Sequence, residues 1–172
     1  VILGVATAQA AFAPFADPVI FLFIGSFILA EGMVVHRLDR RLAFTALSSA
    51  WVGSSGLRLV VAYATVTAVL SMWMSNTATT AMMFPLGVAV LAELGRERKG
   101  DREFQRYALA MMLVTSFAAT IGGMGTPVGT PPNLIGVGLL RTTADINISF
   151  TGWMLVGVPI VILTMAFITV WF

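Results

Sequence analysis

The sequence predicts an all-α, polytopic membrane protein that contains a re-entrant helical hairpin and a broken helix. Three observations lead to this fold class. Of the 172 residues, 58% are hydrophobic and 10% are charged, and the mean hydropathy is +0.93, which soluble domains rarely reach. Apolar runs of about 20 residues recur without the alternating pattern of a membrane β-barrel. Two uncharged 34-residue runs, 59–92 and 107–140, are each interrupted near the centre.

Charge is concentrated in short segments of the chain. The net charge is +2, and nine charged residues lie between Glu93 and Arg106, so we expect this stretch to lie in water. The basic residues are confined to short loops, which gives no support for nucleic-acid binding. The chain contains no cysteine, which excludes disulfides and thiolate metal sites within it.

The first predicted membrane span covers residues 18–35. Pro18 stands in its first turn, where a missing N–H is harmless, and His36 follows its end. The preceding stretch, 1–15, contains Pro14 and is interpreted as the remainder of an upstream helix or a loop at the membrane face. Because the chain opens without a methionine and stops inside an apolar segment, we interpret it as a piece of a longer protein.

Segment 37–58 is predicted to form an interfacial helix followed by a flexible corner. It begins with a basic run, its helix is expected near 42–51, and it closes on Gly53-Ser-Ser-Gly56. The segment is too polar and too short to span a membrane comfortably. Its basic residues favour the cytoplasmic side under the positive-inside rule.

The uncharged run 59–92 is predicted to form a re-entrant hairpin. As one helix it would measure about 50 Å, far beyond the ~30 Å hydrocarbon core, yet two full spans and a turn need more residues. Both flanks, 37–58 and 96–106, are basic, which favours entry and exit on the same side. The polar centre, 71–80, is the expected tip. Irregular backbone at membrane depth requires a protein or water-filled surrounding, so this tip should line a cavity.

The second uncharged run, 107–140, is predicted to be a broken helix. Four glycines and three prolines lie within the twelve residues 122–133, and this composition cannot continue an α-helix. One half should end near Ile121 and the other should start near Asn133. After a polar connection, residues 152–172 form a further predicted span.

Two interruptions at membrane depth in neighbouring segments indicate the binding site of a transporter. A helix start offers N–H donors and partial positive charge to an anion, whereas side-chain and carbonyl oxygens suit a small cation. Neither break contains Lys, Arg or His, so an anion would depend on amides, hydroxyls and bound cations. Sodium is the expected cation, because Ser71, Ser75, Asn76 and backbone carbonyls could replace its waters without a buried carboxylate.

Each feature also has a purely structural interpretation. The Ser-Asn-Thr sequence could provide hydrogen bonds between packed helices, and the Gly/Pro cluster could be an ordinary loop. A structural membrane subunit would leave the combination unexplained. An intramembrane protease would need a nucleophile with its base, paired aspartates or a metal cluster. The single His36 lies in a predicted loop and no acid lies near either break, so we expect no enzymatic activity.

The two breaks resemble a known family. Ser71-Met-Trp-Met-Ser-Asn-Thr-Ala-Thr79, followed by Gly129-Thr-Pro-Pro-Asn133, is similar to the motifs of the divalent anion/sodium symporter family, which includes dicarboxylate and sulfate transporters. Upstream, Phe23-Ile-Gly-Ser-Phe-Ile-Leu-Ala30 and Leu38-Asp-Arg-Arg-Leu-Ala43 are similar too. The resemblance covers nearly the whole chain.

The resemblance implies site residues at both breaks. The residues implied for the first sodium site are Ser71, Ser75, Asn76 and the backbone at Gly129. Those implied to bind or approach the substrate are Ser75, Asn76, Thr77, Thr130 and Pro131. Family members carry two such motif pairs, and this chain contains one, so half of the substrate site and the second sodium site lie outside it.

The resemblance also implies an architecture and a mechanism. The chain matches the first of two inverted repeats, with 1–58 as scaffold-side and interfacial helices and 59–172 as part of a transport domain. Family members are multi-pass homodimers of the cell membrane, in which the transport domain slides as an elevator against the scaffold. The implied function is sodium-coupled symport of small divalent anions such as C4-dicarboxylates. A sulfate or other oxyanion carrier, a proton-coupled carrier and a sodium-independent anion exchanger stay open as alternatives.

Overall fold

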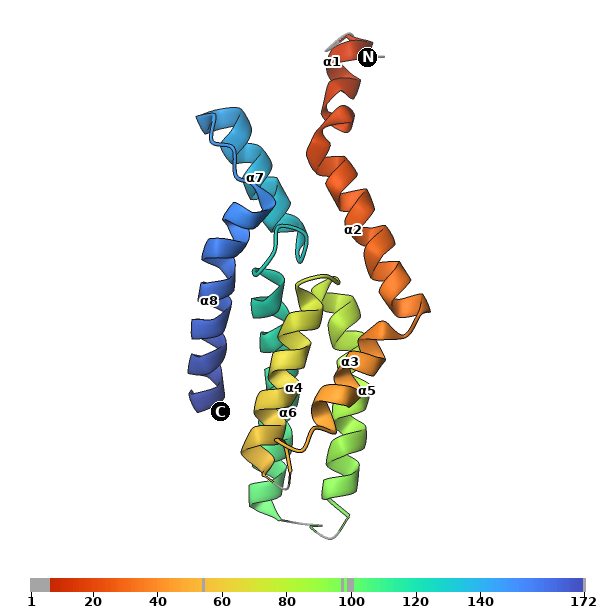
Figure 1. Ribbon diagram of the computed structural model, residues 1–172, viewed down its shortest axis with the longest axis vertical. Coiled ribbons are helices and arrows are strands. Elements are labelled where there is room, and N and C mark those ends of the chain that lie inside the picture. The colour runs from red at the N-terminus through yellow and green to blue at the C-terminus, as the bar shows by residue number, and fades with distance from the viewer. Residues whose placement is uncertain (1–6, 54, 97, 99–100, 172) are drawn as a thin grey trace.

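The computed structural model describes residues 7–171 except 54, 97, 99 and 100, and the described part of the chain contains helices and no strands. Figure 1 shows a helical bundle in its lower half, from which the N-terminal helices extend upward, while the last helix runs back down beside the bundle to the C-terminus. In chain order the elements are α1 (Ala8–Phe12), the 3-10 helix η1 (Ala13–Ala16), α2 (Pro18–Val35), α3 (Leu38–Leu47), α4 (Gly56–Ser71), α5 (Asn76–Leu94), α6 (Arg102–Gly123), α7 (Pro131–Ala144) and α8 (Phe150–Trp171).

Helix α2 has the predicted bounds. Asp17 precedes it in extended conformation and its carboxylate accepts the Val19 N–H at 2.8 Å, which is the usual N-cap bond. Pro18 takes the first position, where no intrahelical donor is needed. Before α2, the stretch predicted as helix or loop forms two short helical pieces, and its first six residues lie outside the described part.

The helix predicted to lie at the membrane interface begins and ends four residues earlier than predicted. Helix α3 covers Leu38–Leu47, so the expected helix near 42–51 is wrong at both ends, and Trp51 lies in the turns that follow, 55% exposed. Ser48 caps the helix, and its hydroxyl donates to the Thr45 carbonyl at 3.4 Å. Serine side chains compete for backbone groups in this way and favour helix ends over helix interiors. The corner then turns through Gly53, whose φ is +49°.

Helices α4 and α5 run antiparallel and are joined by a tight turn at Met72–Ser75, where the tip was expected (Figure 1). Their bounds extend a few residues beyond 59–92 at each end. Helix α5 is nevertheless long and apolar enough to cross a membrane, as are α2 and α8. Entry and exit of this hairpin on one side of the membrane therefore stays a prediction.

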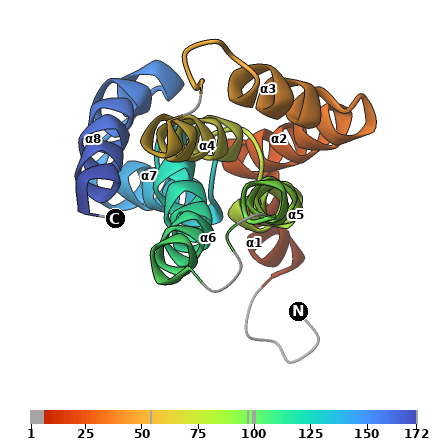
Figure 2. The same cartoon turned by 90° about the horizontal axis from the view of Figure 1, so that it is seen from below.

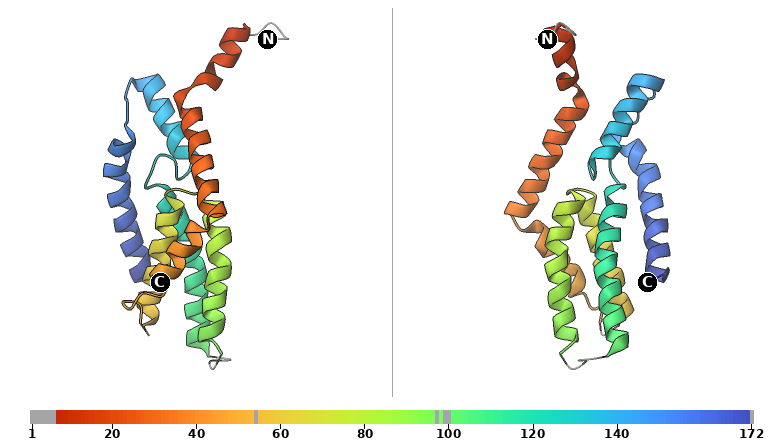
Figure 3. Two further views of the ribbon diagram at one scale, coloured as in Figure 1. Left: turned by 45° about the vertical axis from the view of Figure 1, so that its right-hand side comes forward. Right: turned by 180° about the vertical axis from the view of Figure 1, so that it is seen from behind.

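The predicted break in the second uncharged run is present. Helix α6 ends at Gly123 and α7 begins at Pro131, each within two residues of the expected point. The segment between them is non-helical and passes close to the hairpin tip in both views of Figure 3. Helix α8 then returns alongside the bundle and covers the predicted final span as far as Trp171, since residue 172 lies outside the described part.

The core lies where α4, α5 and α6 pack together, as the view along the bundle in Figure 2 shows. Tyr63 of α4 is fully buried, donates its hydroxyl to the Met83 carbonyl of α5 at 2.8 Å, and lies 3.0 Å from Thr115 Oγ1 of α6. A β-carbon at Gly87 would lie 2.7 Å from the Tyr63 hydroxyl. Glycine at this position therefore lets α5 approach Tyr63. The hydroxyl of Tyr63 in turn links α4 to both α5 and α6.

The outer helices make fewer links to this core. An ion pair between Arg141, in the last turn of α7, and Asp17 joins α7 to the start of α2. Both side chains are about one third exposed. On the other side, α8 leaves large apolar side chains such as Leu155 and Leu163 more than 70% exposed, which suits contact with lipid or with further protein.

Candidate functional site

The hairpin tip lies directly against the end of α6. A β-carbon at Gly122 would come within 2.2 Å of the Ala68 carbonyl oxygen on α4, and one at Gly123 within 2.4 Å of Asn76 Oδ1. A side chain at residue 122 would require a backbone shift, and one at residue 123 would displace the Asn76 side chain. The two glycines therefore allow the backbone of α6 to touch both arms of the hairpin just below the tip.

Ser71 lies at the centre of this contact. It is fully buried, and its hydroxyl lies within donating distance of two acceptors, the Ala119 carbonyl at 2.6 Å and Asn76 Oδ1 at 2.9 Å. A hydroxyl carries one proton and can donate to only one of them at a time. When the hydroxyl donates to one of these oxygens, its own lone pairs and the other oxygen face each other, an arrangement that a small hard cation could coordinate.

The backbone at Gly129 completes the cluster. A β-carbon there would lie 3.0 Å from the Ser71 carbonyl oxygen and 2.5 Å from the Gly123 carbonyl oxygen. The Gly129 N–H is directed to Thr126 Oγ1 at 3.0 Å. Three of the four residues expected to bind sodium are therefore brought together around the end of α6.

Ser75, the fourth of these residues, caps α5. Its hydroxyl accepts the Ala78 N–H at 3.2 Å, and its side chain is exposed. This bond uses one of its two acceptor lone pairs, so the other is available to a ligand. This capping bond was not predicted from the sequence. It stabilises the helix start that carries Asn76 and Thr77.

The two helix starts near the tip differ in what they offer an anion. Asn76 and Thr77 occupy the first two positions of α5, where backbone N–H groups have no carbonyl partner within the helix. Helix α7 begins with Pro131 and Pro132, which carry no N–H. Both starts contribute a positive dipole end, but N–H donors for a carboxylate are concentrated at α5.

Thr130 lies at the N-cap of α7 in extended conformation, and its side chain makes no capping bond. Pro131 beside it is exposed. No described contact joins Thr130 or Pro131 to Thr77, so these residues expected at the substrate are adjacent to the tip but are not brought into one cluster. This is consistent with a site that needs further protein to close around its ligand.

Two polar residues that hold the break in place were missed by the sequence analysis. Asn133 is buried, and its amide donates to the carbonyls of Gly123 and Thr126, both at 2.8 Å. Thr126 is also buried and donates to the Met72 carbonyl at the tip at 2.5 Å. Both are polar residues within a Gly/Pro-rich break, a signal that was available in the sequence but was assigned only to helix interruption.

Helix α8 supports the break from the outside. The indole N–H of Trp153 donates to the Met124 carbonyl at 2.9 Å, directly after the end of α6. The rings of Trp73 at the tip and Phe150 at the start of α8 stack with centroids 6.3 Å apart. These contacts fix the tip and the break relative to α8.

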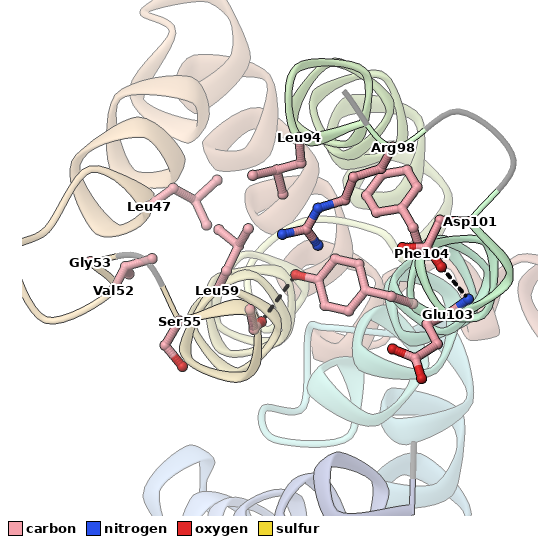
Figure 4. A pocket seen from close by; sticks show the side chains of 12 residues that line it. Leu47, Val52, Gly53, Ser55, Leu59, Leu94, Arg98, Asp101, Glu103 and Phe104 are labelled. Atoms are coloured by element: carbon pink, nitrogen blue, oxygen red, sulfur yellow. Dashed lines mark hydrogen bonds between the residues drawn. The ribbon is translucent and has the colours of Figure 1, made fainter. Parts of the chain in front are cut away.

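A separate cavity of about 420 Å³ lies at the opposite end of the hairpin (Figure 4). It lies between the corner before α4 and the connection from α5 to α6. Tyr107, one of its lining residues, donates its hydroxyl to the Gly56 carbonyl at 3.0 Å. Its lining contains none of the residues expected to bind sodium or substrate.

Comparison with known proteins gives one family and several relatives. The sequence model of a family described as citrate transporter matches residues 1–172. An "Uncharacterized transporter" of Haemophilus influenzae is 40% identical over 164 residues, which are 95% of this chain and 32% of that protein.

Two further relatives are described as the sodium-dependent dicarboxylate transporter SdcS. The protein of Staphylococcus saprophyticus is 37% identical over 153 residues and that of Staphylococcus aureus 36% identical over 151 residues. These alignments cover 87% and 86% of this chain but 29% of each relative. The chain thus spans about three tenths of the length of the curated relatives it matches.

Proposed function

The chain belongs to the citrate transporter family and is a multi-pass membrane protein; on this basis we propose that it forms part of a sodium-coupled secondary transporter for small divalent anions such as C4-dicarboxylates. The observation that carries the proposal is the group of oxygens that meet at Ser71, from its own hydroxyl, the Ala119 carbonyl and the Asn76 side chain, next to the first N–H groups of α5, which have no carbonyl partner within that helix. A cation site and an anion site lie side by side at one turn.

Sodium binds at Ser71, Ser75, Asn76 and the Gly129 backbone in this proposal. The buried hydroxyl, amide and carbonyl oxygens replace the waters of the ion, and no carboxylate is needed. The ends of α4 and α6 point their partially negative carbonyl ends toward the same place, which favours a cation.

The anion binds on the other side of Asn76. One carboxylate accepts hydrogen bonds from the Asn76 and Thr77 N–H groups and from the Ser75 hydroxyl, while Thr130 and Pro131 border the pocket. Because Asn76 belongs to both sites, occupation by sodium fixes the helix start that the anion uses. Thermodynamic linkage then requires that the anion raises the sodium affinity by the same factor.

Larger-scale features of the transporter follow from the same proposal. The chain forms one of two inverted repeats, and a second repeat supplies the other half of the anion site and another sodium site. Helices α4 and α5 form a re-entrant hairpin in a transport domain that moves as an elevator against a scaffold containing α2. The complete protein is a homodimer of the cell membrane, and it does no chemistry on its substrate.

The substrate class is tested by competition. The complete transporter is reconstituted into liposomes, and uptake of radiolabelled succinate is driven by an inward sodium gradient in the presence of unlabelled succinate, citrate or sulfate. The proposal predicts that succinate competes best. Stronger competition by citrate or sulfate would contradict the proposed substrate class but not the transport mechanism. Uptake that continues with potassium in place of sodium would contradict the proposed coupling to sodium.

A further inference from the structure

A surface that carries several hydroxyl groups among apolar side chains continues from the tip along the outside of α5 and α6. An open groove of about 520 Å³ begins at Asn76 and Thr77 and runs along both helices toward the base of the hairpin. This volume is within the ~300–1,000 Å³ typical of small-molecule sites. The hydroxyl groups in its lining come from Thr77 and Thr80 of α5 and from Ser116 and Thr120 of α6.

These hydroxyls are placed by helical periodicity. Residues three or four apart share one face of a helix, so 77 and 80 lie together on α5 and 116 and 120 lie together on α6. Thr120 donates its hydroxyl to the Ser116 carbonyl at 3.0 Å. None of the side-chain hydrogen bonds among the described residues uses the hydroxyls of Thr77, Thr80 or Ser116, so these groups are available to water or a ligand.

The polar lining ends abruptly. Phe84 and Pro85 close the groove about two helical turns from the tip. Beyond them the nearby exposed side chains are apolar, as at Val88 on α5 and Leu113 on α6. A patch of hydroxyls limited to the two turns below the tip is poorly suited to lipid, and its size corresponds to a small solute rather than to a continuous channel.

The groove has the electrostatics of a weak anion site. It starts at the positive dipole end of α5 beside the partially negative carbonyl end of α6, and the two oppose each other. Its lining contains neither an acidic nor a basic residue, and the hydroxyls of Thr77, Thr80 and Ser116 can donate to a carboxylate. Hydroxyl donors hold an anion less firmly than a cationic side chain does. A site along a transport path must bind strongly enough to be entered and weakly enough to be left.

We propose that this groove is a transient second subsite for the transported divalent anion, on its way between the hairpin tip and the base of the hairpin. The proposal rests on the proposed function and adds Thr80, Ser116 and Thr120 to the residues that contact the anion. The base of the hairpin carries the charged connection to α6, so this exit faces the side predicted to be cytoplasmic.

The test uses single cysteines in the complete transporter with any other cysteine replaced. Thr80→Cys, Ser116→Cys and Thr120→Cys are each treated with a negatively charged, membrane-impermeant methanethiosulfonate reagent from the side of the hairpin base. The matched control is Thr164→Cys, since Thr164 on α8 makes the same local bond as Thr120, to the Ile160 carbonyl at 2.7 Å, but lies outside the groove.

The proposal predicts labelling of the three groove cysteines about tenfold faster than of the control, corresponding to ~1.4 kcal/mol, and slowing by saturating succinate with sodium. If the groove cysteines are labelled no faster than the cysteine at position 164, with or without sodium and succinate, other parts of the protein fill the groove. That result would overturn the proposal. Fast labelling that succinate leaves unchanged would overturn it as well.

A second measurement separates this proposal from the proposed function. Ser116→Ala and Thr80→Val are expected to raise the KM for succinate several-fold. The half-saturating sodium concentration, measured at saturating succinate, should stay unchanged, because neither residue belongs to the sodium cluster. If the unmodified transporter shows no sodium-dependent uptake, the proposed function fails. If it transports normally and both variants keep its KM, only the groove proposal fails.

Discussion

The Ser71 hydroxyl lies 2.9 Å from the side-chain oxygen of Asn76, and this bond closes the hairpin turn between the last residue of α4 and the first residue of α5. It brings a buried hydroxyl and an amide oxygen to one place, against the end of α6. The bond joins two residues that the sequence placed at the same expected sodium site. Each of them can be tested by a single substitution.

Replacing Ser71 by Ala removes one oxygen from the cluster. We expect the half-saturating sodium concentration for uptake to rise about tenfold, which corresponds to ~1.4 kcal/mol, because the ion loses a ligand while the remaining oxygens stay in place. The measurement is uptake as a function of sodium concentration.

The control is Thr67→Val, which removes another buried hydroxyl from the same face of α4, one turn earlier. That change should lower stability without affecting the sodium dependence. An equal effect of both variants on sodium would indicate that helix packing, and not ion binding, is responsible.

Replacing Gly122 by Ala should separate α4 from α6. The added β-carbon would meet the Ala68 carbonyl at 2.2 Å, so the backbones must move apart, at a cost of about 1–3 kcal/mol. The readout is the apparent melting temperature of the purified transporter. Gly136→Ala on α7 is the matched control, because no atom lies within 4 Å of its new β-carbon; a drop of the same size in both variants would contradict the close approach.

Replacing Asn133 by Ala should loosen the break. The carbonyls of Gly123 and Thr126 lose their amide donor and stay buried, which costs about 1–3 kcal/mol for an unsatisfied group. Asn133→Asp is expected to be at least as damaging, since a carboxylate only accepts hydrogen bonds. Melting temperature and uptake rate should both fall, whereas Asn147→Asp in the exposed connection before α8 should leave both unchanged.

Replacing Tyr63 by Phe tests the core away from the proposed site. The variant loses the bonds to Met83 and Thr115 and should be less stable by ~1 kcal/mol. Its half-saturating sodium concentration should equal that of the unmodified protein, because Tyr63 lies two turns of α4 from Ser71. A marked change in sodium affinity would show that the core and the tip are coupled.

The sequence predicted the elements of this fold more completely than their contacts. The bounds of α2, the turn of the hairpin and the break between α6 and α7 follow from runs without charge and from local residue types. The end of α3 at Leu47 was missed because the serines after it cap the helix, whereas the apolar pattern continues to Trp51.

The candidate site was predictable only in part. Ser71 and Asn76 could be identified as polar residues at a turn, but their contact with the Ala119 carbonyl depends on how closely α6 approaches. That approach depends on Gly122 and Gly123, which in the sequence were indistinguishable from the other glycines of the break. Asn133 was missed because its partners are backbone carbonyls, and a sequence does not reveal which carbonyls are left without donors.

The most direct test of the account is sodium-driven succinate uptake by the reconstituted complete transporter, compared between the unmodified protein and Asn76→Ala. Asn76 supplies an oxygen to the proposed sodium cluster and an N–H at the start of α5. The account predicts uptake that requires sodium in the unmodified protein and is lost in the variant, with the folded variant still present in the liposomes. Equal sodium-dependent uptake by both proteins would contradict the assignment of the ion and anion site to this hairpin tip.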